Sequence, residues 1–282
     1  MGEAPVDERR DVAARDVDVE PVAWREAGGT AGSAGSAVVP AAFLHGLGGS
    51  RTAWEPQLAA LAAARRCLAW DMPGYGASTP LPSMTFAALA DAAAEWLCST
   101  GAAPSHVLGL SMGGMIAQHL ALAHPDVVRS LVLLDSSPAF GFDGTTDPQE
   151  WVDHRLRPLW AGATLATVAP EVITAIVAPG TGPDVVAGAT GAMARIGPAA
   201  FEQAVRCLPT HDLRGRLDAI TAPTLVIVGQ LDTETPLPYS RYLADVLPNA
   251  RLAVIEGAGH LSNLERPELV NACIAEFLEE HD

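Results

Sequence analysis

The stretch "SHVLGLSMGGMIAQHLALAHP", residues 105 to 125, decides the fold, because it joins two structured runs through a serine between two glycines. The apolar run before Ser111 has the length of a buried strand, and the Ala- and Leu-rich run after it has helical length. Gly109 and Gly113 carry no Cβ, so a strand and a helix can meet closely while the turn exposes the Ser111 hydroxyl. The pattern predicts a strand, a tight turn and a helix with Ser111 as a nucleophile. A serine that simply caps an ordinary helix is the alternative.

Strand-like and helical segments alternate on both sides of this turn. The alternation runs from Val38 to about residue 137, stops in a Pro- and Gly-containing helical region, and resumes near residue 211. We therefore predict an α/β fold, with a mostly parallel central sheet flanked by helices and a helical cap inserted after the sixth strand. The core is expected at 17–137 and 211–282 and the cap at 138–210. Residues 1–16 are expected to be a flexible N-terminus, and "TAGSAGSA" (30–37) a hairpin loop.

A serine hydroxyl is a weak nucleophile until a base takes its proton, so a histidine is required. His260 is the best candidate, because it ends "LAVIEGAGH" just past the last strand, at the carboxyl edge where α/β sheets hold their sites. A carboxylate must orient the imidazole. Asp232 ends "TLVIVGQLD" and gives the chain order Ser, Asp, His, whereas Asp135, which ends "SLVLLD", is the rival.

Two backbone amides are expected to bind the oxyanion of a tetrahedral intermediate. The segment "FLHGLGGS" forms a glycine turn after a strand, so the amide of Leu47 is one candidate donor. The amide of Met112, at the start of the helix after Ser111, is the other. His45 is expected to stabilise this turn. The turn does not fit a dinucleotide-binding loop, because Arg51 stands where that motif requires glycine.

The composition excludes several classes of protein. A formal net charge of −16 disfavours binding to nucleic acid or to an anionic membrane. All 17 basic residues are arginine, so lysine-dependent chemistry and the Walker-type phosphate loop are absent from the sequence. The four cysteines form no C-x-x-C pair and are expected to be reduced and mostly buried, which favours the cytoplasm. No signal peptide, membrane-spanning segment or metal-ligand spacing is evident, so no metal or other cofactor is expected.

With these residues assembled, the sequence resembles the α/β-hydrolase superfamily from about residue 17 onward. The turn "DMPGYGAST" (71–79) matches a pattern common there. Within the superfamily, "GLSMGGMIAQHLA" (109–121), "LPTHDLRGRLDAITAPTLVIVG" (208–229) and "GAGHLSNLERPE" (257–268) resemble 3-oxoadipate enol-lactonases and nearby esterases. The resemblance implies hydrolysis of a small ester or lactone without a cofactor. It assigns Ser111 as nucleophile, Asp232 as acid and His260 as base, with the amides of Leu47 and Met112 as the oxyanion hole.

Three alternatives remain open on the same scaffold. A carbon–carbon hydrolase or a perhydrolase-type enzyme would use the same serine, although Leu261 stands where the carbon–carbon hydrolases have an aromatic residue. A catalytically weak binding protein could also keep the three residues. Within the cap, Trp151 and Trp160 are candidates for the substrate pocket, and Arg195 is a candidate carboxylate anchor. The cap arginines are nevertheless outnumbered by acidic residues, which argues against a dianionic substrate.

Overall fold

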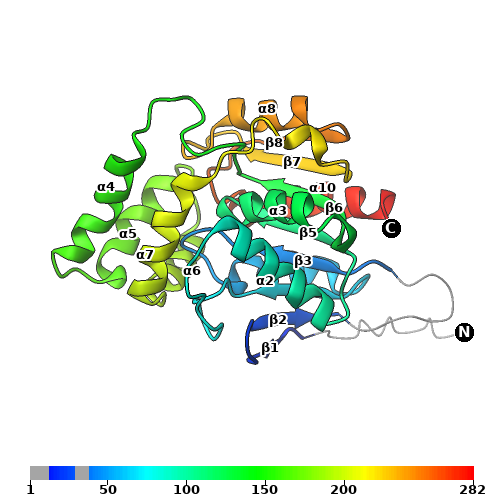
Figure 1. Cartoon of the computed structure of the whole chain (residues 1–282), viewed down its shortest axis with the longest axis horizontal. Coiled ribbons are helices and arrows are strands. Elements are labelled where there is room, and N and C mark those ends of the chain that lie inside the picture. The colour runs from blue at the N-terminus through cyan, green and yellow to red at the C-terminus, as the bar shows by residue number, and fades with distance from the viewer. Residues whose placement is uncertain (1–12, 29–37) are drawn as a thin grey trace, which may run out of the picture.

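The computed structural model describes residues 13–28 and 38–282 and is built on one eight-stranded sheet, shown in Figure 1. The strand order is β1-β2-β4-β3-β5-β6-β7-β8. The pairs β1·β2 and β2·β4 are antiparallel, and every other neighbouring pair is parallel. The strands are β1 (Arg15–Val17), β2 (Trp24–Ala27), β3 (Ala41–Leu44), β4 (Cys67–Trp70), β5 (Ser105–Leu110), β6 (Val128–Leu134), β7 (Thr224–Gly229) and β8 (Ala250–Ile255).

Helices cover both faces of this sheet. The α-helices are α1 (Glu55–Leu61), α2 (Phe86–Ser99), α3 (Met112–Ala123), α4 (Pro148–Trp160), α5 (Leu165–Ile176), α6 (Pro183–Ala194), α7 (Pro198–Cys207), α8 (Leu237–Val246), α9 (Ser262–Glu265) and α10 (Pro267–Glu280). Helices α2, α3 and α8 share one apolar core with one face of the sheet, and α1 and α10 share another with the opposite face. Within the described ranges, none of the helices has the length and apolar character needed to cross a bilayer.

Both faces of the central strands are buried, and the reason is visible in β5 and β6. Val107 and Leu131 point into the core beneath α2 and α3, whereas their neighbours Leu108 and Val132 point into the core beneath α1 and α10. Successive side chains of a strand face opposite sides, so a parallel sheet covered by helices needs apolar residues at nearly every position. This explains the continuous apolar runs in the sequence.

Four consecutive helices, α4 to α7, follow β6 and precede β7, and they lie together beyond one end of the sheet at the left of Figure 1. We refer to them as the cap. Between residues 138 and 210 the structure has no strand, and only an isolated bridge joins Ala139 to Asp212. The predicted fold class, a mostly parallel sheet flanked by helices with a helical insertion after the sixth strand, is confirmed.

The N-terminal boundary differs from the expectation. Residues 1–12 and the loop 30–37 lie outside the described residues, but Arg15 and Asp16 belong to β1 rather than to a flexible segment. The pairing of β1 with β2 places Asp16 opposite Arg25, and the two side chains form an ion pair with an Nε–Oδ1 distance of 2.8 Å. A short strand is thereby held at the sheet edge by hydrogen bonds and charge, and the alternation in "DVDVE" (16–20) is consistent with a strand there.

The four cysteines are free, and their burial is mixed. Cys67 and Cys207 are buried as expected, Cys273 is half-buried, and Cys98 is exposed on α2. The prediction of reduced cysteines agrees with this arrangement, while the prediction that most are buried holds for only two of them.

Candidate active site

Ser111 lies at the tight turn between β5 and α3, and its backbone has φ 53° and ψ −118°. A residue with a side chain rarely adopts positive φ, and the cost is about 1–3 kcal/mol. The turn is crowded on two sides, because α3 approaches both β5 and the end of β3. A Cβ on Gly109 would lie 2.3 Å from the carbonyl oxygen of Gly113, and one on Gly113 would lie 2.0 Å from that of Leu44. Only glycine fits at these two positions, so the chain must reverse at Ser111.

His260 and Asp232 meet Ser111 at the carboxyl edge of the sheet. The Nε2 atom of His260 is 2.9 Å from Ser111 Oγ, and its Nδ1 atom is 2.9 Å from Asp232 Oδ2. Because a carboxylate only accepts hydrogen bonds, Nδ1 carries the proton and Nε2 of the neutral ring accepts from the serine hydroxyl. The structure therefore brings together the three residues that the sequence singled out as a candidate triad.

The surroundings of the triad favour the charged forms of Asp232 and His260. Burial opposes ionisation of Asp232, but the charge and hydrogen bond of His260, with hydrogen bonds from Thr235, lower the pKa of Asp232 below its usual value. Burial also opposes the imidazolium of His260. The charge and hydrogen bond of Asp232, followed by the charges of Asp135 and Glu234, outweigh it and raise the pKa of His260 to about 9. The site is thus arranged to stabilise the imidazolium that forms when His260 takes a proton.

Asp135, the rival acid, has a different set of contacts. It is fully buried at the end of β6 with φ 45°, and its Oδ1 accepts the amide of Gly229 at 2.7 Å. Its Oδ2 accepts from the Ser262 hydroxyl at 2.5 Å and from the Ser262 amide at 3.2 Å. Burial and the neighbouring charge of Asp232 raise the pKa of Asp135 to about 8. The hydrogen bond to the imidazole belongs to Asp232, and Asp135 instead ties β7 to the segment after His260.

The glycine turn after β3 lies beside Ser111. A Cβ on Gly46 would be 3.8 Å from Ser111 Oγ. The Gly46 carbonyl accepts from His45 Nδ1 at 2.8 Å and from the Gly49 amide at 3.0 Å. In a trans peptide the N–H lies opposite the carbonyl, so these bonds turn the Leu47 N–H away from His45. Within the part of the chain that the structure describes, the amides of Leu47 and Met112 donate to no acceptor. Both candidate oxyanion donors are therefore free.

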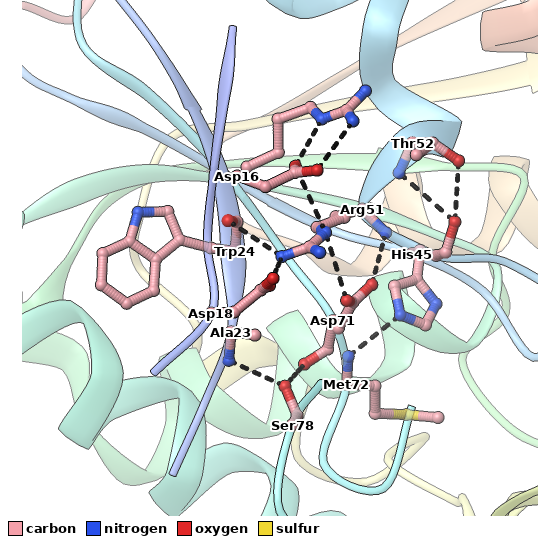
Figure 2. Close-up of polar contacts among 12 residues, drawn as sticks. Asp16, Asp18, Ala23, Trp24, His45, Arg51, Thr52, Asp71, Met72 and Ser78 are labelled. Carbon is pink, nitrogen blue, oxygen red and sulfur yellow. Dashed lines mark hydrogen bonds and ion pairs between the residues drawn. The ribbon is translucent and has the colours of Figure 1, made fainter. Parts of the chain in front are cut away.

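Figure 2 shows how the turn after β4 supports this arrangement. The amide of Met72 donates to Nε2 of the fully buried His45 at 3.0 Å, and the amide of Arg51 donates to Asp71 Oδ1 at 2.9 Å. The Ser78 hydroxyl donates to the Asp71 carbonyl at 2.7 Å and accepts from the Ala23 amide. Burial lowers the pKa of His45, which keeps its ring neutral and able to accept from Met72. The predicted turn-stabilising role of His45 matches these contacts.

Tyr75 is a supporting residue that the sequence analysis missed. Its buried hydroxyl donates to the Leu47 carbonyl at 2.9 Å, and its ring packs 5.4 Å from that of His45. The motif "DMPGYGAST" contained the signal, but nothing in a single sequence shows which side chain of that motif reaches the glycine turn.

The cap and the sheet edge enclose a cavity of about 1130 Å³ that includes Ser111, His260 and Leu47 in its lining. The cap side is largely apolar, with Phe140, Trp151, Val172, Met193 and Phe201 among the residues that line it. Ligand sites in proteins commonly combine such walls with a few convergent polar groups. Among residues 13–28 and 38–282, no three His, Cys, Asp or Glu side chains are grouped so that they could hold a metal ion.

The three candidate cap residues differ in position. Trp151 lines the cavity and packs edge-on against Phe140, with ring centroids 5.2 Å apart. Trp160 is 53% exposed, does not line the cavity, and lies beneath the guanidinium of Arg206. Nine residues of α-helix turn through about 900°, so the two tryptophans project from opposite faces of α4. The expectation for Trp160 is corrected accordingly. Arg195 lines the cavity but is exposed.

Comparison with known proteins identifies the family. A family model described as the alpha/beta hydrolase fold matches residues 42–267, most of the chain. The chain belongs to the α/β-hydrolase family. The resemblance drawn from the motifs around Ser111 and His260 is therefore confirmed, and the chain is a hydrolase.

Relatives of this hydrolase bear several names. It is 32% identical over 259 residues to BpoC of Mycobacterium tuberculosis, named for a non-heme bromoperoxidase, and the match covers 84% of this chain and 93% of the relative. It is also 32% identical over 213 residues to the pimeloyl-[acyl-carrier protein] methyl ester esterase of Chromobacterium violaceum, with coverage of 74% and 82%. The solved enol-lactonase of Burkholderia xenovorans superposes with a TM-score of 0.82 at 24% identity, covering 94% of this chain and all of the other, and supports the fold alone.

The contacts of the two carboxylates predict unequal effects of substitution. We expect Asp232→Asn to lower kcat by about 10²- to 10⁴-fold, because the amide cannot hold the imidazole in the required tautomer. Asp135→Asn should lower kcat much less, since Asp135 does not contact the ring. Steady-state kinetics on both folded variants provides the measurement. If Asp135→Asn had the larger effect, the acid would be Asp135 at the end of β6.

The raised pKa of His260 predicts an activity that increases with pH. His260 must be neutral to accept the Ser111 proton, so kcat/KM should climb with pH along an acidic limb above 6.5, the unperturbed value, and toward about 9. This limb lies higher than the pKa of about 6.5 of an unperturbed histidine. A pH–rate profile from 5 to 10 tests it, and a plateau already complete at pH 6 would contradict it.

Proposed function

We propose that the chain is a cofactor-independent serine hydrolase that cleaves a small ester or lactone through an acyl-enzyme. The observation that carries the proposal is the continuous chain of hydrogen bonds from Ser111 Oγ through His260 to Asp232. It lies at the floor of a cavity that also contains the free amide of Leu47. The similarity to a methyl ester esterase supports ester hydrolysis as the reaction.

The proposed reaction begins when Ser111 Oγ attacks the carbonyl carbon and His260 Nε2 takes the hydroxyl proton. The carbonyl oxygen becomes an oxyanion and accepts hydrogen bonds from the amides of Leu47 and Met112. When the intermediate collapses, His260 returns the proton to the departing alkoxide, and the alcohol leaves. Water then attacks the acyl-enzyme with the same base, which releases the acid and restores Ser111.

The charge around the cavity favours a neutral substrate. Four carboxylates line the cavity, those of Glu55, Glu171, Asp184 and Glu234, against the two guanidinium groups of Arg155 and Arg195. Arg155 is already paired with Glu234 at 3.0 Å and stacks over Trp151. Arg195 and the four carboxylates are all exposed, so water screens their charges, and Glu55 is itself paired with Arg25. A carboxylate buried against the apolar wall would lack a dedicated partner, and an unpaired buried charge is costly.

We propose, on the same evidence, that Trp151 forms part of the apolar wall against which the acyl or ring portion of the substrate packs. Arg195 is a poor carboxylate anchor in this arrangement, because it is exposed.

A perhydrolase activity is a second candidate, and the similarity to BpoC is the observation that favours it. If hydrogen peroxide rather than water attacked the acyl-enzyme, the products would be a peracid and free Ser111. A peracid can oxidise bromide to hypobromite and is itself reduced to the acid. This route needs the same three residues and no bound cofactor.

Loss of Ser111 should abolish the reaction. We expect Ser111→Ala to fold normally and to lose turnover of p-nitrophenyl acetate, because the turn accepts a small side chain and only the nucleophile is removed. A fluorophosphonate probe should label the wild-type chain once per molecule and leave Ser111→Ala unlabelled, as measured by mass spectrometry. Comparable turnover in the folded variant would refute the serine mechanism.

The charge of the cavity predicts selectivity between two matched esters. A dimethyl diester and its monomethyl half-ester present the same methyl ester on the same carbon chain and differ by one carboxylate. We expect kcat/KM to favour the neutral diester by about tenfold or more per ester group. Glu234→Gln, which releases Arg155 from its ion pair, should shift the ratio toward the half-ester. Equal or faster cleavage of the half-ester by the wild type would overturn the proposed preference.

A further inference from the structure

Glu265 is a buried carboxylate that the proposed reaction does not use, and its contacts surround His260. Its Oε2 atom accepts the amide of Gly259 at 3.1 Å, and its Oε1 atom accepts the amide of Leu261 at 3.0 Å. These are the residues immediately before and after His260. A carboxylate that accepts several backbone N–H bonds is held firmly in one position.

The same carboxylate also reaches the cap. Oε2 accepts the amide of Ala178 at 2.7 Å and the hydroxyl of Thr181 at 2.8 Å, both in the connection between α5 and α6. The amide of His260 itself donates to the carbonyl of Ile176, the last residue of α5, at 2.9 Å. All three consecutive amides from 259 to 261 are therefore bound either to Glu265 or directly to the cap.

Gly259 shows how closely the two segments pack. A Cβ at this position would lie 2.5 Å from the amide nitrogen of Ala178 and 2.8 Å from the carbonyl oxygen of Ile176. Only a residue without a side chain lets the α5–α6 connection approach the His260 segment at this distance. The contact is thus backbone against backbone, with the Glu265 carboxylate as its shared acceptor.

We propose that Glu265 is a positioning residue that fixes the backbone of His260 from both sides and joins it to cap residues 176–181, so that this edge of the cap and the base move as one unit. The proposal rests on the proposed serine-hydrolase function, in which His260 is the base. The opposite edge of the cap is held differently. There Arg155 of α4 meets Glu234 in an ion pair that is partly exposed and therefore weak.

Glu265→Gln tests the positioning role with almost no change in shape. One carboxylate oxygen becomes an NH₂ group, which cannot accept, so either the Leu261 amide or the Gly259, Ala178 and Thr181 donors lose their acceptor. We expect kcat for p-nitrophenyl acetate to fall about tenfold or more while KM changes about twofold or less, because the ring is misplaced but the cavity is intact. The rate of fluorophosphonate labelling should fall in parallel, since it depends on the same base.

Glu26→Gln is the matched control. Glu26 is similarly buried, with 8% exposure against 7% for Glu265, but it lies in β2 and is paired with Arg66. We expect this variant to lose stability with kcat unchanged. If Glu265→Gln and Glu26→Gln have the same kcat at equal folded fractions, the positioning role is wrong. The proposed function is judged separately, because wild-type labelling that is lost in Ser111→Ala upholds it whatever Glu265 does.

Hydrogen exchange on the wild-type chain tests the link between cap residues 176–181 and the His260 segment even if Glu265→Gln does not fold. The amides of Ala178, Gly259, His260 and Leu261 should exchange slowly and at similar rates, as members of one cooperative unit. The exposed segment 143–147, between β6 and α4, provides the fast reference. If Ala178 exchanged as fast as that segment while residues 259 to 261 stayed protected, the cap and the His260 segment would not form one unit. That result would overturn the inference.

Discussion

The close approach of β5 and α3 is the constraint on which the rest of the site depends. Gly109 lets β5 approach α3, and Gly113 lets α3 approach the end of β3, both at distances that no side chain tolerates, and Ser111 between them adopts positive φ. The strain is small compared with the burial of the elements that impose it, because α3 and β5 both place buried side chains in the same apolar core. The hydroxyl therefore stands at the sheet edge as a consequence of packing and not of its own local preference.

Two buried carboxylates lie near the imidazole, and the fold gives them separate tasks. Asp232 faces His260 directly and is held by hydrogen bonds from Thr235 and Glu234. Asp135 satisfies the amide of Gly229 and both donors of Ser262, and so connects the ends of two loops. Burial and the neighbouring charge of Asp232 raise the pKa of Asp135, and the negative charges of the two carboxylates favour a charged His260. The two carboxylates lie in the same buried region, so their roles differ because each one faces different hydrogen-bond donors.

The cap covers the cavity and also contributes hydrogen bonds to the segment around His260. Its α5–α6 connection takes part in the backbone hydrogen bonds around His260, whereas its α4 side meets the core through the pair of Arg155 and Glu234. That pair also neutralises the less exposed of the two arginines that line the cavity, which leaves the interior apolar and the rim acidic. Under the proposed function, substrate preference and the position of the base therefore depend on the same insertion.

The sequence by itself determined the fold class, the nucleophile turn and the candidates Ser111, Asp232 and His260, because these follow from local rules. Strand and helix periods, glycine at close contacts and the position of a residue at the end of a strand are all visible within a few residues. The hydrogen bond that singles out Asp232 over Asp135, the separation of Trp151 from Trp160, and the link from Glu265 to Ala178 were decided only by the tertiary structure. Each depends on which atoms from distant segments lie within about 3 Å of one another, and residue type does not encode such a distance. The start of β1 at Arg15 belongs to the same group, since the alternating "DVDVE" (16–20) indicates a strand but its pairing with β2 decides where the strand begins.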